Sequence, residues 1–231
     1  MQGKIKRIDV LDLGFVDLLD TMGNELTIVN AARVSFGKHK AEWDEKDELL
    51  LKYLIENHHT TPFEHVQFQF RIKCPLYIRS QWHRHRTWSY NEISRRYTEQ
   101  DIEDCYNPEL FRQQSESNRQ ASSDKVPINN NLLVEKYKEH VEKAVALYRE
   151  LLEGGVCREQ ARGVLPQALY TEFYATVDLH NLLHFIELRI SPHAQWEIQQ
   201  YARALLELIE PYVPVTVKWF KEQCRSQGIK F

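Results

Sequence analysis

Cysteine, glycine and proline are scarce in this sequence, and each shortage excludes a class of protein. The four cysteines, Cys74, Cys105, Cys157 and Cys224, are far apart and form no CxxC pair, so we expect reduced thiols rather than a disulfide framework. Eight glycines and eight prolines in 231 residues are too few for a collagen or a low-complexity chain. Apolar residues make up 42% and charged residues 27%, which is typical of a globular protein.

Long apolar runs and a strong charge of one sign are also missing. No stretch approaches the roughly 18 apolar residues that a membrane-spanning helix needs. The first 14 residues lack the uninterrupted apolar segment of a signal peptide. We therefore expect a soluble cytoplasmic protein that makes no membrane contact. A formal net charge of −3 argues against a bulk electrostatic hold on nucleic acid, although a local basic patch is compatible with it.

The common nucleotide and hydrolase motifs are absent as well. The sequence contains no G-x-G-x-x-G fingerprint, no G-x-x-x-x-G-K-[ST] loop and no G-x-S-x-G elbow. A nucleotide or a flavin, if this chain binds one, must therefore be held by a different architecture.

The pattern of apolar residues predicts an α+β protein. Residues 66–73 alternate between apolar and polar side chains, as in a strand with one buried face, and residues 4–13 and 169–177 are also expected to be strands. Helices are expected over 24–36, 44–57, 75–82, 132–153, 158–164, 178–189, 194–210 and 215–224. We expect a single domain spanning residues 1–231, in which helices flank one mixed β-sheet.

Two of these segments carry further expectations. In the helix over 44–57, Leu49, Leu50, Tyr53 and Leu54 are expected to form the buried apolar stripe. Residues 100–131 are dominated by Glu, Gln, Ser, Asn and Asp, which predicts a long polar loop or lid within the domain.

Residues 84–97 form the densest group of chemically active side chains. Arg84, Arg86, Arg95 and Arg96 fall with a histidine inside thirteen residues, and Ser94 adds a hydroxyl beside two of these arginines. Guanidinium groups present planar forks of donors that suit phosphate and carboxylate oxygens. The segment is either a basic surface held by salt bridges or an anion site large enough for more than one phosphate.

Histidines form a second group. Five of them fall between residues 58 and 85, and His180, His184 and Glu187 share one face of an expected helix. Such spacing can bind a metal, but arginines flank His85 on both sides and no H-E-x-x-H motif is present. We therefore predict no metal site, and we expect neutral imidazoles to contact a planar cofactor instead.

Arg189 lies at the expected C-terminal end of a helix. The simplest role for a cation there is to complement the helix dipole, and nothing in the surrounding residues alone excludes that role.

The sequence also resembles a known family. Arg84-His85-Arg86, followed after seven residues by Ser94, is similar to the RHR-x7-S signature of the flavin-dependent thymidylate synthases. Further segments resemble the family in the same order along nearly the whole chain, namely 60–65, 79–82, 94–97, 164–166, 188–189 and 193–197.

The resemblance implies an activity, a cofactor and an assembly. Members of the family convert dUMP to dTMP with 5,10-methylenetetrahydrofolate as the carbon donor and with FAD, reduced by NADPH, as the hydride source. It implies a homotetramer whose active sites form between subunits. The many arginines agree with this chemistry, because dUMP, FAD and folate are all anionic.

The resemblance also implies roles for individual residues. Those expected to bind FAD are Thr61, Arg84, His85, Arg86, Glu92, Asp178, His180 and His184. Those expected to bind dUMP are Gln81, Arg84, Glu92, Ile93, Ser94, Arg95, Arg96, Arg162 and Arg189. Arg189 is the expected catalytic residue, because it matches the arginine that favours ionisation of the uracil N3.

Two of these positions depart from the familiar form of the family, which has Asn and Arg where this chain has Asp178 and His180. An ionised aspartate cannot donate a hydrogen bond as asparagine can, and a neutral histidine carries no fixed charge.

Two alternative hypotheses come from other classes of protein. The arginines interleaved with Trp88, Tyr90 and Tyr97 could serve a single-strand nucleic-acid-binding module. The histidines could serve a metal-dependent hydrolase, which a chelator would inactivate. A visible flavin absorption spectrum separates the synthase hypothesis from both.

Overall fold

The computed structural model describes residues 5–116, 118 and 121–231. Its centre is one five-stranded sheet in the order β1-β2-β3-β5-β4. The strands are β1 (Lys6–Val10), β2 (Gly14–Met22), β3 (Gln67–Pro75), β4 (Ser89–Glu92) and β5 (Tyr170–Asp178). The expected first strand, 4–13, is shorter here, and its residue 4 lies outside the described part of the chain.

Every strand pair in this sheet is antiparallel, so the α+β class is confirmed and the expected mixed sheet is wrong. The reason lies in how the chain returns to the sheet. Pro75 at the end of β3 pairs with Tyr170 at the start of β5, so the long excursion between them leaves and re-enters at the same end. A parallel pair would need a crossover to the opposite end.

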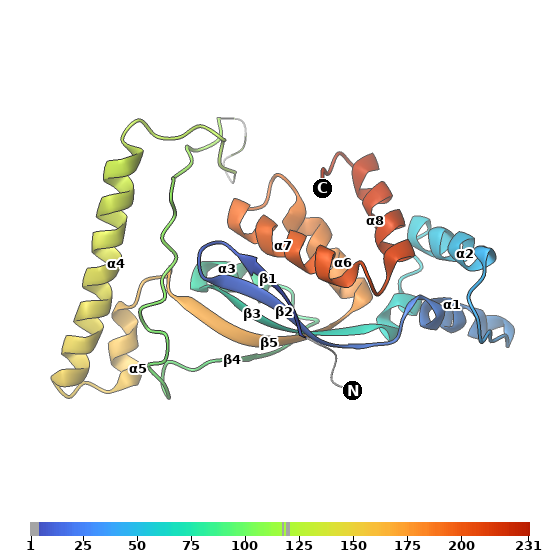
Figure 1. The fold of residues 1–231 in the computed structure, drawn as a ribbon, viewed down its shortest axis with the longest axis horizontal. Coiled ribbons are helices and arrows are strands. Elements are labelled where there is room, and N and C mark those ends of the chain that lie inside the picture. Colours follow the sequence, from blue (N-terminus) through green and yellow to red (C-terminus); the bar gives the residue numbers. More distant parts are fainter. Residues whose placement is uncertain (1–4, 117, 119–120) are drawn as a thin grey trace.

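The alternation in β3 sets the two faces of the sheet. Phe68, Phe70, Ile72 and Cys74 are buried, whereas the polar residues between them are half-exposed. The buried face packs against α6 (Leu179–Ile190) and α7 (Trp196–Ile209), which lie over the sheet in Figure 1.

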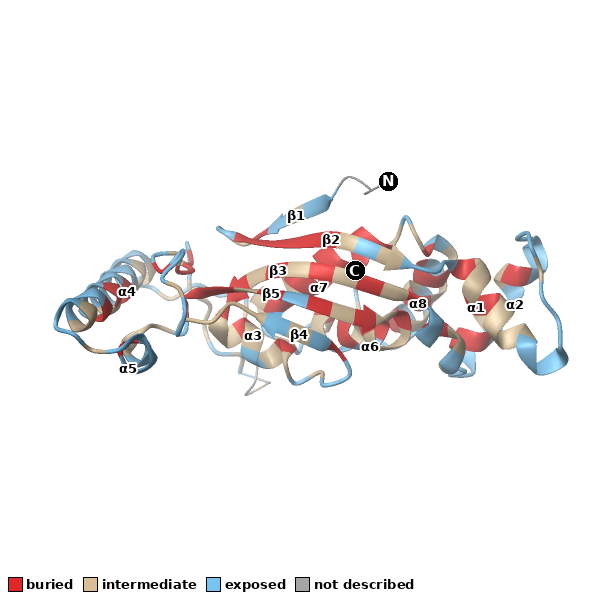
Figure 2. Ribbon diagram, turned by 90° about the horizontal axis from the view of Figure 1, so that it is seen from below, coloured by how far each residue is buried: buried red, intermediate tan, exposed pale blue. Residues whose placement is uncertain are grey.

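The opposite face of the sheet is polar, and Figure 2 shows no helix crossing it. Its charged side chains neutralise one another across the strands. Asp17 is fully buried and accepts two hydrogen bonds from Arg7, at 2.7 and 2.9 Å, and two from Arg71, at 2.8 and 3.0 Å. Pairing of this kind allows a carboxylate to be buried without neutralisation.

The helices follow the sequence pattern closely. The other α-helices are α1 (Glu25–Arg33), α2 (Glu45–Glu56), α3 (Leu76–Trp82), α4 (Asn130–Glu153), α5 (Arg158–Ala161) and α8 (Pro214–Ser226). Three short 3-10 helices are η1 (Val34–Phe36), η2 (Thr61–His65) and η3 (Arg162–Val164). Within the described part of the chain, none of the helices is long and apolar enough to cross a membrane.

The expected stripe on α2 is wrong in part. Leu54 is buried, but Leu49 and Tyr53 are 66% and 52% exposed, and Leu51 and Ile55 are buried instead. The helix turns this other face inward because α1 and α8 both pack against it. Two large apolar side chains are thereby left on the surface.

Within 100–131, the described residues are mostly irregular, as predicted, although α4 already begins at Asn130; residues 117, 119 and 120 lie outside the described part. Two isolated antiparallel β-bridges involve this segment, one between Cys105 and Leu169 and one between Gln114 and Ser122. The segment runs beside α4 in Figure 1. Around Cys105, α4 and α5 build a second, smaller apolar cluster. Lid motion of this segment stays a prediction.

Candidate active site

The turn that carries Arg84 and Arg86 is anchored by two buried tryptophans. Trp82 ends α3 and Trp88 precedes β4, and their rings meet edge to face at 5.9 Å. The chain between them is fixed by the Tyr90 hydroxyl, which donates to the carbonyl of His85 at 3.0 Å. Both arginines are exposed, and no carboxylate of the described residues pairs with either of them. Two unpaired guanidinium groups suit an anionic ligand.

His85 and Arg189 are joined side chain to side chain. The Nε of Arg189 donates to His85 Nε2 at 3.1 Å, and its Nη2 donates to the backbone carbonyl of Gln81 at 3.3 Å. Burial, with the neighbouring Arg189 and His184, lowers the pKa of His85 to about 4. The imidazole is therefore neutral at pH 7 and accepts through Nε2. Arg189 is thus fixed by α3 and the turn after it, a role beyond complementing the dipole of its own helix.

A cavity of about 560 Å³ collects most of the expected dUMP residues. Its walls come from α3, β4, η3 and β5, and they include Glu92, Ile93, Ser94, Arg95 and Arg162. These residues meet because β4 pairs with β5 and the chain then turns toward η3. The cavity is lined by three arginines, two glutamates and the Ser94 hydroxyl. Guanidinium groups suit a phosphate, and the hydroxyl and carboxylates can bond the hydroxyls of a sugar.

The polar groups of this cavity are already oriented. The Thr171 hydroxyl donates to Glu92 Oε1 at 2.7 Å, and Arg79 lies 3.1 Å from the same oxygen. Arg95 lines the cavity and is fixed by the backbone, because it donates to the Tyr170 carbonyl at 3.1 Å and also to the Gln100 carbonyl. Arg96 is exposed and lies 3.4 Å from Glu159, outside the lining of the cavity.

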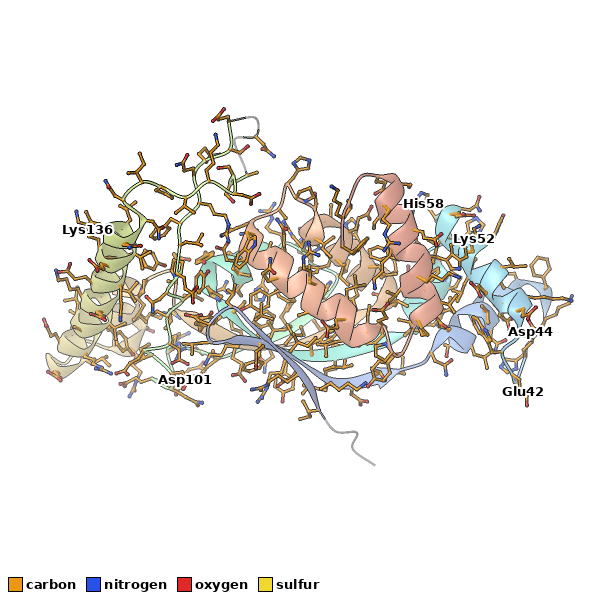
Figure 3. The ribbon with its side chains drawn as sticks, turned by 45° about the horizontal axis from the view of Figure 1, so that its top comes forward. Glu42, Asp44, Lys52, His58, Asp101 and Lys136 are labelled. Carbon is orange, nitrogen blue, oxygen red and sulfur yellow. The ribbon has the colours of Figure 1, made fainter. Side chains whose placement is uncertain are left out.

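A second cavity, of about 190 Å³, collects histidines from the loop after α2 and from α6. Leu54, Ile55, Phe63, Leu183 and Phe220 form its apolar walls. Its polar lining comprises His58, His59, Thr60, His180, His184, Glu187 and Gln223. Figure 3 labels His58, which lies between the end of α2 and α8.

The two expected flavin contacts His180 and His184 do lie together in this second cavity, and His184 faces His85 with ring centroids 6.1 Å apart. The sequence analysis missed His58 and His59 as site residues. Their signal was their place among the five closely spaced histidines, which were expected as a group to contact a planar cofactor but were not all assigned as individual site residues. In the described part of the chain, no group of three or more His, Cys, Asp or Glu side chains is placed to hold a metal ion.

Asp178 has a structural partner of its own. Its carboxylate caps α6, accepting from the backbone N–H of Asn181 at 2.9 Å and from the Asn181 side-chain amide at 2.7 Å. An acceptor at this position explains how aspartate can stand where the resembling family has asparagine. Thr61, another expected FAD contact that does not line the histidine cavity, is exposed at the start of η2, next to Thr60, which does line it.

The fit to FAD can be examined from these groups. Aliphatic walls with imidazoles at the edge suit a flat, partly polar ring system, and the unpaired Arg84 and Arg86 suit a pyrophosphate. The donors present are therefore of the kind that FAD requires.

Comparison with known proteins decides the family. A model of the family described as thymidylate synthase complementing protein matches residues 17–215. The chain belongs to this family. A flavin-dependent thymidylate synthase of Thermus thermophilus is 49% identical over 222 residues, which cover 96% of this chain and 80% of that protein. One from Thermotoga neapolitana is 45% identical over 214 residues, covering 93% and 94%.

A solved structure agrees with the fold. The UMP/dUMP methylase PolB from Streptomyces cacaoi, bound with 5-Br dUMP, superposes with a TM-score of 0.83 at 31% identity, covering 93% of this chain and 97% of that one. Membership in the flavin-dependent thymidylate synthases confirms the enzyme class and the FAD cofactor that the RHR-x7-S motif predicted. It favours the synthase over the nucleic-acid and metal-hydrolase alternatives.

Proposed function

We propose that this chain methylates dUMP reductively to dTMP, with 5,10-methylenetetrahydrofolate as the carbon donor, NADPH as the reductant and FAD as its cofactor. The observation that carries the proposal is the fixed position of Arg189 against a neutral His85 in a member of this family.

On the nucleotide side, the cavity around Ser94, Arg95 and Arg162 holds the phosphate and sugar of dUMP, with Glu92 and Ile93 beside them. Arg189 and Gln81 face the pyrimidine, and Arg84 and Arg96 supply further positive charge. The guanidinium of Arg189 stabilises negative charge that develops at N3 and its flanking carbonyls without having to lose a proton. Its bond to His85 helps to hold it in position, since a neutral imidazole offers a lone pair to Nε.

On the cofactor side, His180, His184 and Thr61 hold the ring system of FAD, and His85, Arg84 and Arg86 hold its more polar parts. FAD supplies the hydride when it is bound. Asp178 acts through the cap that it provides to α6, and Glu92 reaches the cofactor from the nucleotide cavity.

The assembly that fits this arrangement is a homotetramer with shared sites. The histidine cavity and the nucleotide cavity of one chain have no lining residue in common, so each chain supplies two partial sites. Large apolar side chains are exposed on β2, η1 and α2, which suits a surface that a second copy covers: Met22, Val34, Phe36, Leu49 and Tyr53.

The test is the reaction itself with the purified protein. We expect the visible bands of an oxidised flavin, and dTMP formation that requires dUMP, methylenetetrahydrofolate and NADPH together. Arg95→Ala should weaken dUMP binding strongly, whereas Arg158→Ala, which removes an exposed arginine paired with Glu99, should not. A colourless protein that forms no dTMP when FAD is added would refute the proposal.

A further inference from the structure

A series of side-chain hydrogen bonds connects Gln81 to the ion pair of Glu197 and Arg112. Gln81 Nε2 donates to Gln195 Oε1 at 2.5 Å, and Gln195 Nε2 donates to Glu197 Oε2 at 2.9 Å. The other oxygen of Glu197 lies 3.6 Å from Arg112 Nη1. Residues from α3, from the start of α7 and from the irregular segment 100–131 thus meet in one line.

We propose that Glu197 is a positioning residue that fixes, through Gln195, which atom of the Gln81 amide faces the substrate. This rests on the proposed function, in which Gln81 contacts dUMP. The amides of glutamine can be turned either way, because each carries one donor end and one acceptor end. A carboxylate has no donor, so it can set the direction of every amide connected to it.

The direction follows link by link. Glu197 accepts only, so Gln195 turns its Nε2 toward it and its Oε1 away. Gln195 Oε1 then accepts from Gln81 Nε2, which leaves the Oε1 of Gln81 as the end of the chain. Among the described residues, no donor is bonded to that oxygen. Gln81 therefore presents an acceptor, and the matching ligand group is an N–H or O–H donor of the nucleotide.

The ion pair of Glu197 and Arg112 fixes one end of this hydrogen-bond series. The side chains of Glu197 and Arg112 are only 12% and 18% exposed. The guanidinium of Arg112 also lies over the ring of Trp196, 4.0 Å from its centroid. Both charged groups line a cavity of about 690 Å³ that residues 108–114 also line. A shielded ion pair is screened less than a surface pair and holds its geometry better.

Gln81, at the other end of this hydrogen-bond series, contacts Arg189. The backbone carbonyl of the same Gln81 accepts from Arg189 Nη2 at 3.3 Å. One residue therefore positions the guanidinium with its backbone and presents an acceptor with its side chain. A turned amide would present a donor to the same ligand group and would repel it.

The test is Glu197→Gln, which keeps the size of the side chain but can donate as well as accept. The Gln195 and Gln81 amides are then free to turn. We expect the Kd for dUMP, measured by calorimetry on the flavin-loaded protein, to rise about fivefold, as for one lost hydrogen bond. We expect the KM for dUMP to rise similarly, with kcat and the flavin content within about twofold. The control is Glu210→Gln, which removes a carboxylate from an ion pair with Lys221 at the end of the same helix.

A double variant shows whether the effect passes through Gln81. In a Gln81→Ala background, Glu197→Gln should change dUMP affinity no further, because the amide that it orients is gone. Equal effects in both backgrounds, or no effect of Glu197→Gln on dUMP affinity, would overturn the proposal. Calorimetry separates this result from a failure of the proposed function, because dUMP affinity is measured without turnover.

Discussion

Arg189 is the residue on which the proposed chemistry depends most directly. Its two hydrogen bonds use Nε and Nη2, which are spaced by the rigid guanidinium fork. Lysine has one nitrogen and cannot keep both bonds. Arg189→Lys should therefore reduce turnover at saturating dUMP by about 10²-fold or more, as for one lost oxyanion donor.

The alternative role of Arg189 makes a different prediction. If it only complements the dipole of α6, lysine would serve equally well and dTMP formation would stay near normal. Flavin content and NADPH oxidation should survive the substitution in either case, because the change lies on the pyrimidine side. These two measurements are the control for folding.

His85 gives the site a defined pH dependence. Its pKa is lowered to about 4 in the folded chain from 6.5, so below pH 6.5 the unfolded chain binds a proton that the folded chain does not. The stability is therefore complete above pH 6.5 and falls as the pH is lowered toward 4. His85→Gln keeps an acceptor for Arg189 and does not titrate.

Between pH 7.5 and 5, the wild type should lose more unfolding free energy than His85→Gln, as measured by urea denaturation at equal flavin content. One proton accounts for at most about 1.4 kcal/mol per pH unit, and solvent at this half-buried ring reduces the difference. Parallel pH profiles for the two proteins would contradict the neutral state of His85.

The cysteines are expected to take no part in the chemistry. Burial raises the pKa of Cys74, that of Cys105 to about 11 and that of Cys224 to about 12, so none of the three is a thiolate at pH 7. Cys157 is exposed before α5 and lines neither cavity of the site. Replacing all four should leave dTMP formation within about tenfold, with some loss of core packing. A folded, flavin-loaded single-cysteine variant without activity would show that a thiol is required.

At the scale of elements, α6 carries His180, His184 and Arg189, and Asp178 caps its first turn. Asp178→Ala should lower the free energy of unfolding by about 1 kcal/mol, whereas Asp178→Asn should keep the cap, since asparagine is an equally good N-cap. Urea denaturation of both variants measures the difference. Equal destabilisation by alanine and asparagine would assign the carboxylate a role other than capping.

The elements show what sequence alone can predict. The ends of β3, α6 and α7 were predicted within two residues, because local pattern determines them. The expected helices over 24–36 and 158–164 instead end as α-helix at Arg33 and Ala161 and continue as 3-10 turns. Strands β2 and β4 were missed. Five successive residues of β2 are buried, which hides the alternation, and β4 is four residues long and exists because it pairs with β5.

Some residues of the site could be predicted from the sequence, and others could not. Glu92, Ile93, Ser94 and Arg95 are neighbours in sequence, so a motif finds them, and the structure places all four on one cavity. The link from Gln81 to Gln195 joins residues 114 positions apart. No local pattern encodes such a contact, because it depends on how α3 and the start of α7 pack against the sheet.

At the scale of the whole molecule, the proposed assembly makes a first prediction about mass. Light scattering on the flavin-loaded protein should give about four times 27.5 kDa, because closed symmetry covers the exposed apolar side chains of η1 and α2 on every copy. An active monomer would refute the shared sites.

Mixing two inactive variants tests the sharing itself. Arg86 lies on the exposed turn after α3, and Arg96 lies beyond β4 near Glu159. In the proposed tetramer, these two arginines reach one active site from different subunits. Arg86→Ala and Arg96→Ala should each be inactive alone, because each removes one guanidinium from every site. In tetramers assembled from an equal mixture, about a quarter of the sites receive both intact arginines, so about a quarter of the wild-type activity should return.

A mixture of Arg86→Ala with the Arg86→Ala/Arg96→Ala double variant contains no intact site and is the matched control. If the first mixture is as inactive as the control, both arginines of a site come from one chain, and each subunit works alone.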